Sequence, residues 1–328
     1  MVEIEEVAKR TTVAATLRNE YATLPEFIDS LLRQSIMPLE IVLVDGGSYD
    51  GTVDYLREVA AGNSLVRLIE SGNTNISQGR NIAAEAARGD IIAFTDAGSH
   101  ADVHWLKNLL LSLSDGGEMV VVGGYTNPIC SSFLQKLLAC VNLPLLNEVK
   151  QKRFMPSSRN IALYKSAWRA AGGYPEWLAF GEDMYFDITL KKLGYEIRFQ
   201  PGAVVNWHLR SNVVSIFKQF FRYSSGDGVA DMYSKRHALR FLSYLLLVAI
   251  ILVSFFYCRY ALIVLIILGA AYLVRIYLRS FKVFKGRIWE LVLSWILIPV
   301  MVFYMDIAKM CGYLYGLLKR RTVKKTLV

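Results

Sequence analysis

The chain has 328 residues and a formal net charge of +9, and 54% of its residues are hydrophobic. Its cations gather beside apolar stretches near the C-terminus, at Lys282, Lys285, Arg287, Lys319, Arg320, Arg321, Lys324 and Lys325. Cations in such positions favour a membrane surface, and no basic and aromatic pattern of an RNA-binding module accompanies them, so we exclude nucleic acid as a partner.

Two further features bound the class of protein. The four cysteines form no CxxC pair and have no His at zinc spacing, which predicts buried or lipid-facing thiols. The segment 1–10 is acidic and lacks an apolar core, which predicts no secretory signal and a catalytic part that stays in the cytoplasm.

Short apolar runs then alternate with amphipathic segments. Strands are expected at 11–17, 40–46, 65–71, 90–96 and 118–124, and helices at 24–35, 51–61, 77–88 and 102–114. This alternation predicts an α/β fold with a mostly parallel sheet covered on both faces. Ligands of such sheets gather at the carboxyl ends of the strands. The polar residues that fall there are Thr16, Arg18, Asn19, Glu20, Asp45 and Asp96.

From about residue 239 the composition becomes that of a membrane segment. The stretches 239–257 and 260–274 each supply most of the ~20 apolar residues that cross a bilayer core. Because only Cys258 and Arg259 separate them, they predict a hairpin of two spans, near 239–257 and 260–278.

A third apolar segment, 289–318, contains Pro299, Asp306 and Lys309 and has cations on both sides. At 1.5 Å per residue it covers only about 45 Å, too short for two crossings. A kinked or re-entrant segment would keep both basic ends in the cytoplasm, whereas one tilted span would suit the length. Both interpretations stay open. We therefore expect a catalytic domain over 1–235 and a membrane domain with a basic tail over 236–328, in a multi-pass protein of the cell membrane.

Two motifs have the composition of a nucleotide site. In "VDGGSYDGT" (44–52), Asp45 is placed to bond a nucleobase edge, and the glycines let a ligand approach the backbone. Asp50 is expected to be the N-cap of the next helix. In "SQGRNIAAEAARGD" (77–90), a helix opens with a cation and free N–H groups, which suit a diphosphate.

Taken in order, five motifs resemble the inverting nucleotide-sugar glycosyltransferases of family 2, which have the GT-A fold. They are "TLRNE" (16–20), "VDGGSYDGT", "GRNIAAEAARGDIIAFTDAGS" (79–99), "GGYPEWLAFGEDMYFDITLKKLGY" (172–195) and "QFFRY" (219–223). The resemblance covers roughly residues 10 to 230. It implies that Thr16, Glu20 and Asp45 hold the base and ribose and that Arg80 lies near the phosphates. Arg18, at the same edge, is included in the expected donor site.

The family usually binds a divalent cation with an Asp-x-Asp motif at a strand end, but this chain has Asp96-Ala97-Gly98. Oxygen ligands suit Mg²⁺ or Mn²⁺, and since diphosphate and water can fill the other positions, one carboxylate can suffice. The resemblance thus implies Asp96 as metal ligand. It also places His208 where some relatives have a further ligand, although a His after an apolar strand is otherwise more often structural.

The acceptor side is expected around a second acidic motif, "FGEDMYFD" (180–187). Glu182 and Asp183 start a helix, where the helix dipole alone favours acids. The resemblance implies that Asp183 is the general base that deprotonates the acceptor hydroxyl, with Glu182 beside it on the acceptor or diphosphate side.

"QFFRY" matches the QxxRW element of many relatives, with a Tyr for the Trp, which implies Gln219 and Arg222 near the acceptor and the diphosphate. Alternatively, 213–223 is an amphipathic helix lying on the membrane, with Lys218 and Arg222 facing headgroups.

These expectations together describe a membrane-anchored inverting glycosyltransferase. It would use a nucleotide-diphosphate sugar and Mg²⁺ or Mn²⁺, with a lipid-linked or membrane-proximal glycan as acceptor and membrane lipids as partners. One alternative is a processive polysaccharide synthase, for which the membrane portion is small. A nucleotidyltransferase would need a second carboxylate and would leave "GEDMYFD" unexplained. A non-catalytic membrane scaffold is the third alternative, because Gly98 replaces the usual second acid.

Overall fold

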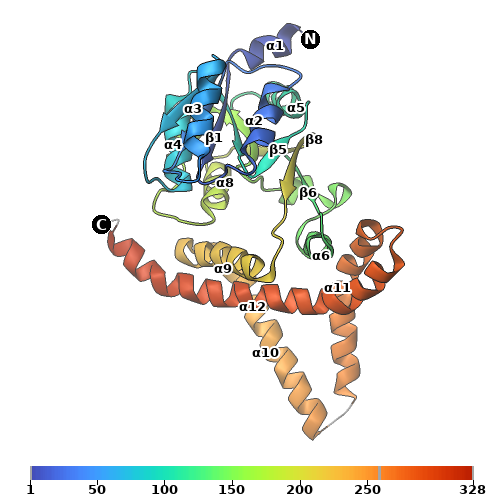
Figure 1. Ribbon diagram of the computed structural model, residues 1–328. Helices are drawn as coiled ribbons and strands as arrows, with labels where there is room; N and C mark the ends of the chain where they lie inside the picture. The colour runs from blue at the N-terminus through green and yellow to red at the C-terminus, as the bar shows by residue number, and fades with distance from the viewer. Residues whose placement is uncertain (1, 258–259, 327–328) are drawn as a thin grey trace. The chain divides into compact units, whose positions relative to one another are not determined.

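The computed structural model describes residues 2–257 and 260–326, and its chain folds into two compact units (Figure 1). The sheet unit runs to Ile129 and resumes over Leu146–His208. The helical unit comprises Cys130–Leu145 and the chain from Leu209 onward. Because the helical unit includes residues 209–235, it is larger than the membrane domain expected from residue 236; that domain boundary stays a prediction.

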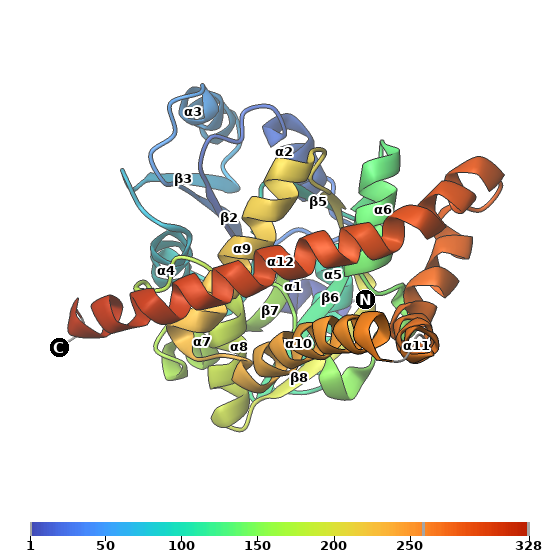
Figure 2. The ribbon, with the colours of Figure 1, turned by 90° about the horizontal axis from the view of Figure 1, so that it is seen from below.

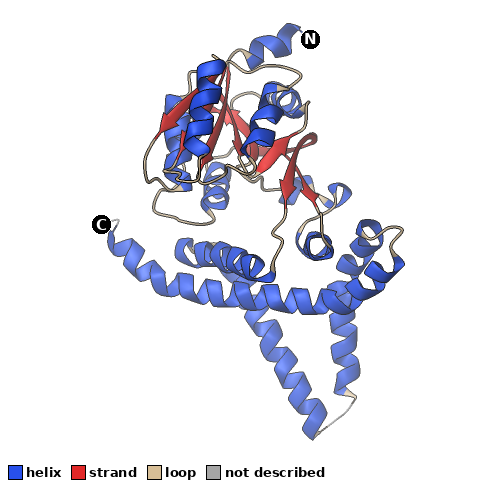
Figure 3. Ribbon diagram, viewed as in Figure 1, coloured by secondary structure: helices blue, strands red, loops and turns tan. Residues whose placement is uncertain are grey.

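Within the described residues, eight strands form one sheet in the order β3-β2-β1-β4-β7-β6-β8-β5 (Figure 3). Strands β3, β2, β1 and β4 are parallel neighbours, and β6 pairs in parallel with β8. β7 is antiparallel to β4 and β6, and β5 is antiparallel to β8. The predicted mostly parallel α/β sheet is confirmed. The strands are β1 (Thr11–Leu17), β2 (Glu40–Asp45), β3 (Val66–Glu70), β4 (Ile91–Asp96), β5 (Ser99–Ala101), β6 (Val120–Ile129), β7 (Asn160–Tyr164) and β8 (Glu196–His208).

All five strands expected from the apolar runs form, as do the four expected helices, whereas β5, β7 and β8 were not expected. β5 is too short to show a pattern, and Pro201 and Gly202 interrupt the apolar alternation of β8. The helices of the sheet unit are α1 (Val2–Ala8), α2 (Leu24–Leu32), α3 (Thr52–Gly62), α4 (Ile76–Ala86), α5 (Trp105–Ser114), α7 (Lys165–Ala170), α8 (Glu182–Lys192) and two 3₁₀ turns, Leu146–Glu148 and Gln151–Arg153.

The sheet is buried on both faces because successive side chains of a strand point to opposite sides. In β1, Val13 and Ala15 join a core cluster with Phe27 of α2. Ala14, between them, joins the opposite cluster with Phe94 of β4. Burial on both faces explains the unbroken apolar runs of these strands.

The helical unit contains α6 (Phe133–Asn142), α9 (Val213–Ala230), α10 (Ser234–Phe256), α11 (Ala261–Val283) and α12 (Ile288–Thr326). Three of these helices, α10, α11 and α12, are long and apolar enough to cross a membrane. The apolar side chains of α10 and α11 are largely exposed within the unit. The turn predicted at Cys258 and Arg259 lies outside the described residues, as do the side chains of Lys324 and Lys325.

The third apolar segment forms one helix of 39 residues, α12, which continues through Pro299. α9 packs across it (Figures 1 and 2). The two backbones approach so closely that a Cβ on Gly312 or Gly316 would overlap the carbonyl oxygens of Phe221 or Ser225. Small residues that permit such close approach are typical of helix pairs in membranes.

Candidate active site

The predicted strand-end residues meet at the carboxyl edge of the parallel strands. Asp45 ends β2 and Asp96 ends β4, and both strands flank β1. The strand register pairs Leu17 with Asp45 and Thr16 with Asp96. Residues far apart in the sequence therefore occupy neighbouring positions at one edge, where ligands of such sheets bind.

One carboxylate oxygen of Asp45 accepts hydrogen bonds from the following loop, and the other has no partner among the described residues. Its side chain is buried, and Oδ2 accepts hydrogen bonds from the backbone N of Gly47 (2.8 Å) and Ser48 (3.0 Å). Among the described residues, Oδ1 has no hydrogen-bond partner. A buried acceptor without a partner is costly, so a donor group of a ligand would complete it. The predicted contact with a nucleobase is consistent with this geometry.

The loop after β1, which contains Arg18 and Glu20, is tied to the loop after β2. Asn19, with φ of 56°, donates from its backbone N to Ser48 Oγ (2.8 Å), and Glu20 N donates to Thr52 Oγ1 (3.0 Å). Asp50 is not the N-cap that we expected. The N-cap of α3 is Gly51, whose φ of 95° favours glycine, and Asp50 Oδ1 accepts from Thr52 N (3.1 Å).

An ion cluster formed by Arg80, Asp96 and Glu182 lies behind this edge. Asn75 and Gln78 form a capping box that starts α4, and a Cβ on Gly79 would overlap the side chain of Thr16. This close packing places the next residue, Arg80, against the strand ends. Arg80, 2% exposed, bridges Asp96 Oδ1 (2.9 Å) and Glu182 Oε1 (2.7 Å).

The pKa values of the two acids of this cluster, Asp96 and Glu182, are shifted in opposite directions. Burial raises the pKa of Asp96, but the charges of Arg80 and Arg159 outweigh it and hold the pKa below the ordinary value. For Glu182, burial and then the charge of Asp183 raise the pKa above its ordinary value, against the effect of Arg80. Asp96 is therefore the more persistent anion of the pair.

Asp183 is joined to Asp96 through two residues that sequence analysis did not find. Asp183 Oδ2 accepts from Ser157 Oγ (3.4 Å), which accepts from Arg159 Nε (3.2 Å). The same Nε lies 3.8 Å from Asp96 Oδ2, and the Arg159 guanidinium stacks over the ring of Trp207 at 4.0 Å. "SSR" (157–159) precedes β7, and because β7 is antiparallel to β4, the start of β7 lies at the edge where β4 ends. Because β7 was not expected from the sequence, Ser157 and Arg159 were not recognised as residues at a strand start.

The structure carries no ligand, so the fit of a divalent cation is tested on its donors. Asp96 Oδ1 is bound to Arg80, whereas Oδ2 has only the ion pair with Arg159 at 3.8 Å among the described residues. One carboxylate oxygen is thus open to a cation, which would draw its other ligands from water and phosphate, as Mg²⁺ commonly does. The residues present fit a cation bound in this way.

The remaining predicted residues come from other elements of the chain. His208 ends β8 and lies close to Glu26 and His100. Gln219 and Arg222 lie on α9 of the helical unit, where Gln219 Nε2 donates to Tyr223 Oη at 3.0 Å. Their predicted roles at the acceptor and the diphosphate stay predictions.

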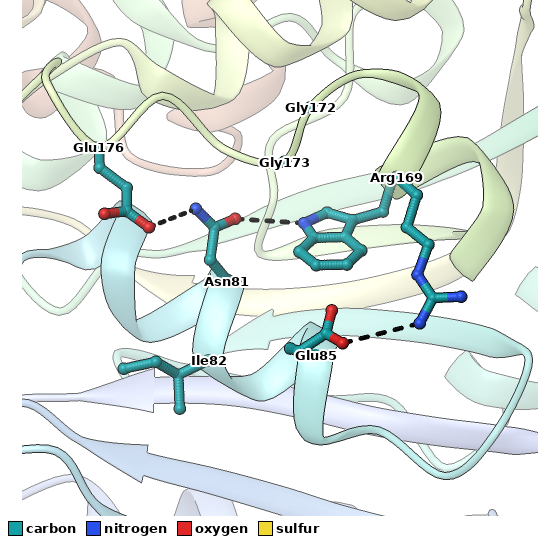
Figure 4. A pocket seen from close by; sticks show the side chains of 8 residues that line it. Asn81, Ile82, Glu85, Arg169, Gly172, Gly173 and Glu176 are labelled. Carbon is teal, nitrogen blue, oxygen red and sulfur yellow. Dashed lines mark hydrogen bonds and ion pairs between the residues drawn. The ribbon is translucent and has the colours of Figure 1, made fainter.

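A shallow pocket of about 460 Å³ lies between α4, α7 and the loop before α8, and none of the residues predicted for the site lines it (Figure 4). Asn81 bonds both Trp168 Nε1 (3.2 Å) and Glu176 Oε1 (2.9 Å), and Glu85 pairs with Arg169 at 3.7 Å. Because its polar side chains bond one another and none of the strand-end acids lines it, we do not assign the chemistry to this pocket.

Comparison with known proteins identifies the class of protein that this fold and site define. Residues 12–168 match the model of glycosyl transferase family 2. The chain is accordingly a glycosyltransferase with a GT-A type domain followed by apolar helices that could span a membrane.

Among its relatives is the succinoglycan biosynthesis protein ExoA of Rhizobium meliloti (strain 1021), 27% identical over 72% of this chain and 74% of that protein. Another is the O-antigen chain rhamnosyltransferase RfbN of Salmonella typhimurium (strain LT2), 26% identical over 60% of this chain and 66% of that protein. The crystal structure of GalNAc-T7 with UDP, GalNAc and Mn²⁺ superimposes with a TM-score of 0.51 at 18% identity. It covers 67% of this chain and 47% of that one, and shows likeness of fold alone.

Proposed function

We propose that this glycosyltransferase transfers a sugar, with inversion, from a nucleotide-diphosphate sugar to a hydroxyl of a lipid-linked or membrane-proximal glycan. One observation carries the proposal. Asp96 from β4 and Asp183 from α8, predicted as metal ligand and base, lie at one sheet edge and are connected through Arg159 and Ser157.

Each residue of the edge has a chemical task in this proposal. Asp45 Oδ1 accepts a hydrogen bond from the nucleobase, while Thr16 and Glu20 hold the ribose side. Asp183 removes the proton of the acceptor hydroxyl, whose oxygen attacks the anomeric carbon from the face opposite the diphosphate. A divalent cation bound at Asp96 would neutralise the departing diphosphate.

Arg80 has a different task from the phosphate contact that the sequence suggested. Both of its ion pairs are to protein carboxylates, and its side chain is 3% exposed. We propose that Arg80 fixes Asp96 and Glu182 in position, and that Arg159, 15% exposed and held over Trp207, is the arginine nearer the ligand. A planar guanidinium stacked on an aromatic ring is well suited to phosphate oxygens.

The acceptor class is supported by the helical unit and by the relatives. Three helices could cross a membrane, which would hold the sheet unit near lipid-linked substrates. The names of two relatives refer to succinoglycan biosynthesis and to O-antigen chains. We propose a multi-pass protein of the cell membrane with its sheet unit in the cytoplasm.

The test uses the full chain in lipid nanodiscs with a panel of nucleotide sugars and Mn²⁺. We expect release of nucleotide from one donor class, faster with an acceptor glycolipid, and loss of release in Asp96→Asn with the fold intact. Release that Asp96→Asn leaves unchanged would contradict the role of Asp96. No release from any donor would favour the scaffold alternative, and long polymeric products would favour the processive synthase.

A further inference from the structure

The helix α12 is much longer than a membrane crossing requires. Its 39 residues span about 58 Å at 1.5 Å per residue, nearly twice the ~30 Å hydrocarbon core of a bilayer. A helix of this length either crosses the bilayer with long ends outside it or lies along the membrane surface. The contacts that α12 makes with α10, α11 and α9 distinguish these two arrangements.

α12 is bonded to the same end of both neighbouring helices. Trp295 Nε1 donates to Ser280 Oγ (3.1 Å) in the last turn of α11. Further along α12, the ring of Tyr313 stacks on that of His237, in the first turn of α10, with centroids 4.0 Å apart. α10 and α11 run in opposite directions, so the first turn of one and the last turn of the other lie at one end of the pair, beside α12 (Figure 1).

The spacing of these two contacts along α12 fixes its direction. The stretch from Trp295 to Tyr313 covers about 27 Å at 1.5 Å per residue. A crossing helix would carry these two residues to nearly opposite faces of the hydrocarbon core. Their partners in α11 and α10, however, lie at one end of the pair, and therefore at one face of any membrane that the pair crosses. α12 consequently runs across the direction of α10 and α11 (Figures 1 and 2).

α9 supports the same arrangement, because it packs on the middle of α12. Tyr304 Oη donates to Val213 O at the start of α9 (2.9 Å), and the close approach at Gly312 lies further along the same helix pair. Lys218 and Arg222 of α9 are exposed. If this part of α12 lay in the hydrocarbon core, α9 would carry both cations into it, and charges in a bilayer core are costly.

The face of α12 turned away from α9 carries an apolar stripe with no charged member. At about 100° per residue, six residues on successive turns fall within about 80° of the helix circumference. Five of them are exposed, and Ile307 is half-buried. We call these six residues the apolar stripe: Ile296, Val300, Phe303, Ile307, Cys311 and Leu314.

The residues around the apolar stripe identify its partner as an anionic bilayer surface. Trp289, 86% exposed, lies near the start of α12, and Trp is enriched where membrane meets water. Exposed cations lie at both ends: Lys285 and Arg287 precede α12, and Lys319 and Arg321 lie in its last turns. Such cations are attracted to anionic headgroups. An apolar helix face with Lys and Arg beside it is typical of helices in the interface plane.

We propose that α10 and α11 cross the membrane, whereas α12 lies in the interface plane of the leaflet at their shared end. The apolar stripe contacts acyl chains, and the flanking cations contact the headgroups of anionic phospholipids. The segment 289–318 then needs neither a full crossing nor a re-entrant turn, and both of its basic ends stay on one side. The proposal rests on the membrane location within the proposed function, and not on the sugar transfer.

Spin labels measure the depth of α12 in the membrane. The full chain, with its other cysteines replaced by serine, carries one label at a time in vesicles that contain phosphatidylglycerol. Collision of the label with oxygen, which concentrates in the bilayer, and with a nickel chelate, which stays in water, gives the depth. The labelled positions are those of the apolar stripe. The control positions on α11 are Ile263, Leu268 and Tyr272, all exposed within the helical unit.

We expect the six stripe labels at one depth, about 5–10 Å into the boundary between headgroups and acyl chains, and Leu268 deeper than all of them. A depth that increases toward the bilayer centre at Phe303 and decreases again toward Leu314 means that α12 crosses, and overturns the proposal. Stripe labels that avoid lipid and show spin–spin coupling between two chains assign the stripe to a second copy, and also overturn it. A shallow Leu268 overturns the membrane location itself.

Sidedness is a second measurement that needs no label in the apolar stripe. In sealed inside-out vesicles, a membrane-impermeant maleimide is applied to Lys285→Cys and Thr322→Cys, two exposed positions near the ends of α12, in the cysteine-free chain. Equal labelling supports a surface helix, and labelling of one position alone overturns the proposal. The transfer assay is independent of both measurements: absence of transfer with the expected depths contradicts the proposed function and leaves the position of α12 standing.

Discussion

Each of the two units contains a buried ion cluster, and the two clusters are satisfied to different degrees. In the sheet unit, Arg80 bridges Asp96 and Glu182. In the helical unit, Asp306 of α12 accepts from Arg240 Nε (3.0 Å) and Tyr244 Oη (3.2 Å), both on α10. Both oxygens of Asp306 are therefore bonded, and this acid joins two helices.

The sheet-unit cluster retains open acceptors at its edge. Among the described residues, Asp96 Oδ2 has only a long ion pair with Arg159, and Asp45 Oδ1, outside the cluster but at the same sheet edge, has no partner. A fully bonded buried cluster stabilises packing, whereas one with open lone pairs can receive a ligand. Both clusters are buried and charged, so the open oxygen of Asp96 is what distinguishes it from Asp306.

The largest expected effect concerns Asp183, the proposed base. Asp183→Asn is nearly isosteric and should lower transfer by roughly 10²–10⁴-fold, the usual contribution of a positioned base. Donor binding and folding should survive, because the side chain is only partly buried. Transfer rate and donor affinity are measured separately. If Asp183 served only the helix start, the variant would lose about 1 kcal/mol of stability and little rate.

Glu182→Gln is the companion variant. We expect a smaller loss of transfer, because Gln can still accept the hydrogen bond from Arg80 that Glu182 Oε1 accepts at 2.7 Å. A larger loss in Glu182→Gln than in Asp183→Asn would mean that the base has been assigned to the wrong acid.

The second effect concerns the fully bonded Asp306 cluster of the helical unit and is a loss of stability. Asp306→Asn leaves the largely buried Arg240 without its carboxylate, which should cost about 3–5 kcal/mol. Transfer per folded molecule should be unchanged. Thermal unfolding in nanodiscs measures the loss. The control is Asp231→Asn, which breaks the exposed pair with Arg320 (2.8 Å) and should cost less than about 1 kcal/mol. Equal losses in both variants would contradict the structural role of Asp306.

The third effect concerns cation binding at Asp96, where a second acid is added at position 98. A Cβ on Gly98 would meet no atom within 4 Å, so Gly98→Asp can be accommodated. It restores the two-carboxylate pattern and should tighten Mn²⁺ binding about tenfold, or about 1.4 kcal/mol. Electron paramagnetic resonance of free Mn²⁺ measures the affinity. Gly98→Asn, of similar size without charge, should have little effect, and equal gains in both variants would argue against a cation at Asp96.

The smallest effect concerns Asp187, a buried acid for which burial and the charge of Asp183 outweigh the charge of Lys191. Asp187 is 1% exposed and both its oxygens lack partners among the described residues. Burial, and then the charge of Asp183, raise the pKa of Asp187 well above its ordinary value. The unfolded carboxyl ionises near about pH 3.9. Stability is therefore fully present below that pH and is lost as pH rises through the folded pKa.

Asp187→Asn removes the loss of stability that the ionisation of Asp187 causes as pH rises. We expect equal melting temperatures for the wild-type chain and the variant near about pH 4, and a variant more stable by on the order of a few degrees at about pH 7. Melting curves across this pH range measure the difference. A variant less stable than the wild-type chain at neutral pH would show that the ionised carboxylate has a favourable partner.

The sequence by itself determined the elements whose signal is local. Apolar periodicity predicted β1 to β4, β6 and the helices between them, because strands buried on both faces need continuous apolar runs. Asp45 and Asp96 were found because a polar residue after such a run marks the strand end. The apolar length of residues 239–278 predicted α10 and α11 in the same way.

Only the tertiary structure decided which side chains became partners. Arg80 was expected at the phosphates from its helix start, but strand and helix packing places two carboxylates beside it. Ser157 and Arg159 reach the site because they precede the antiparallel strand β7, and His100 lies beside His208 because β5 pairs with β8. These pairings connect segments far apart in the chain, and their short strands have no periodic signal. The chemistry of the edge is therefore set by long-range contacts that no local pattern encodes.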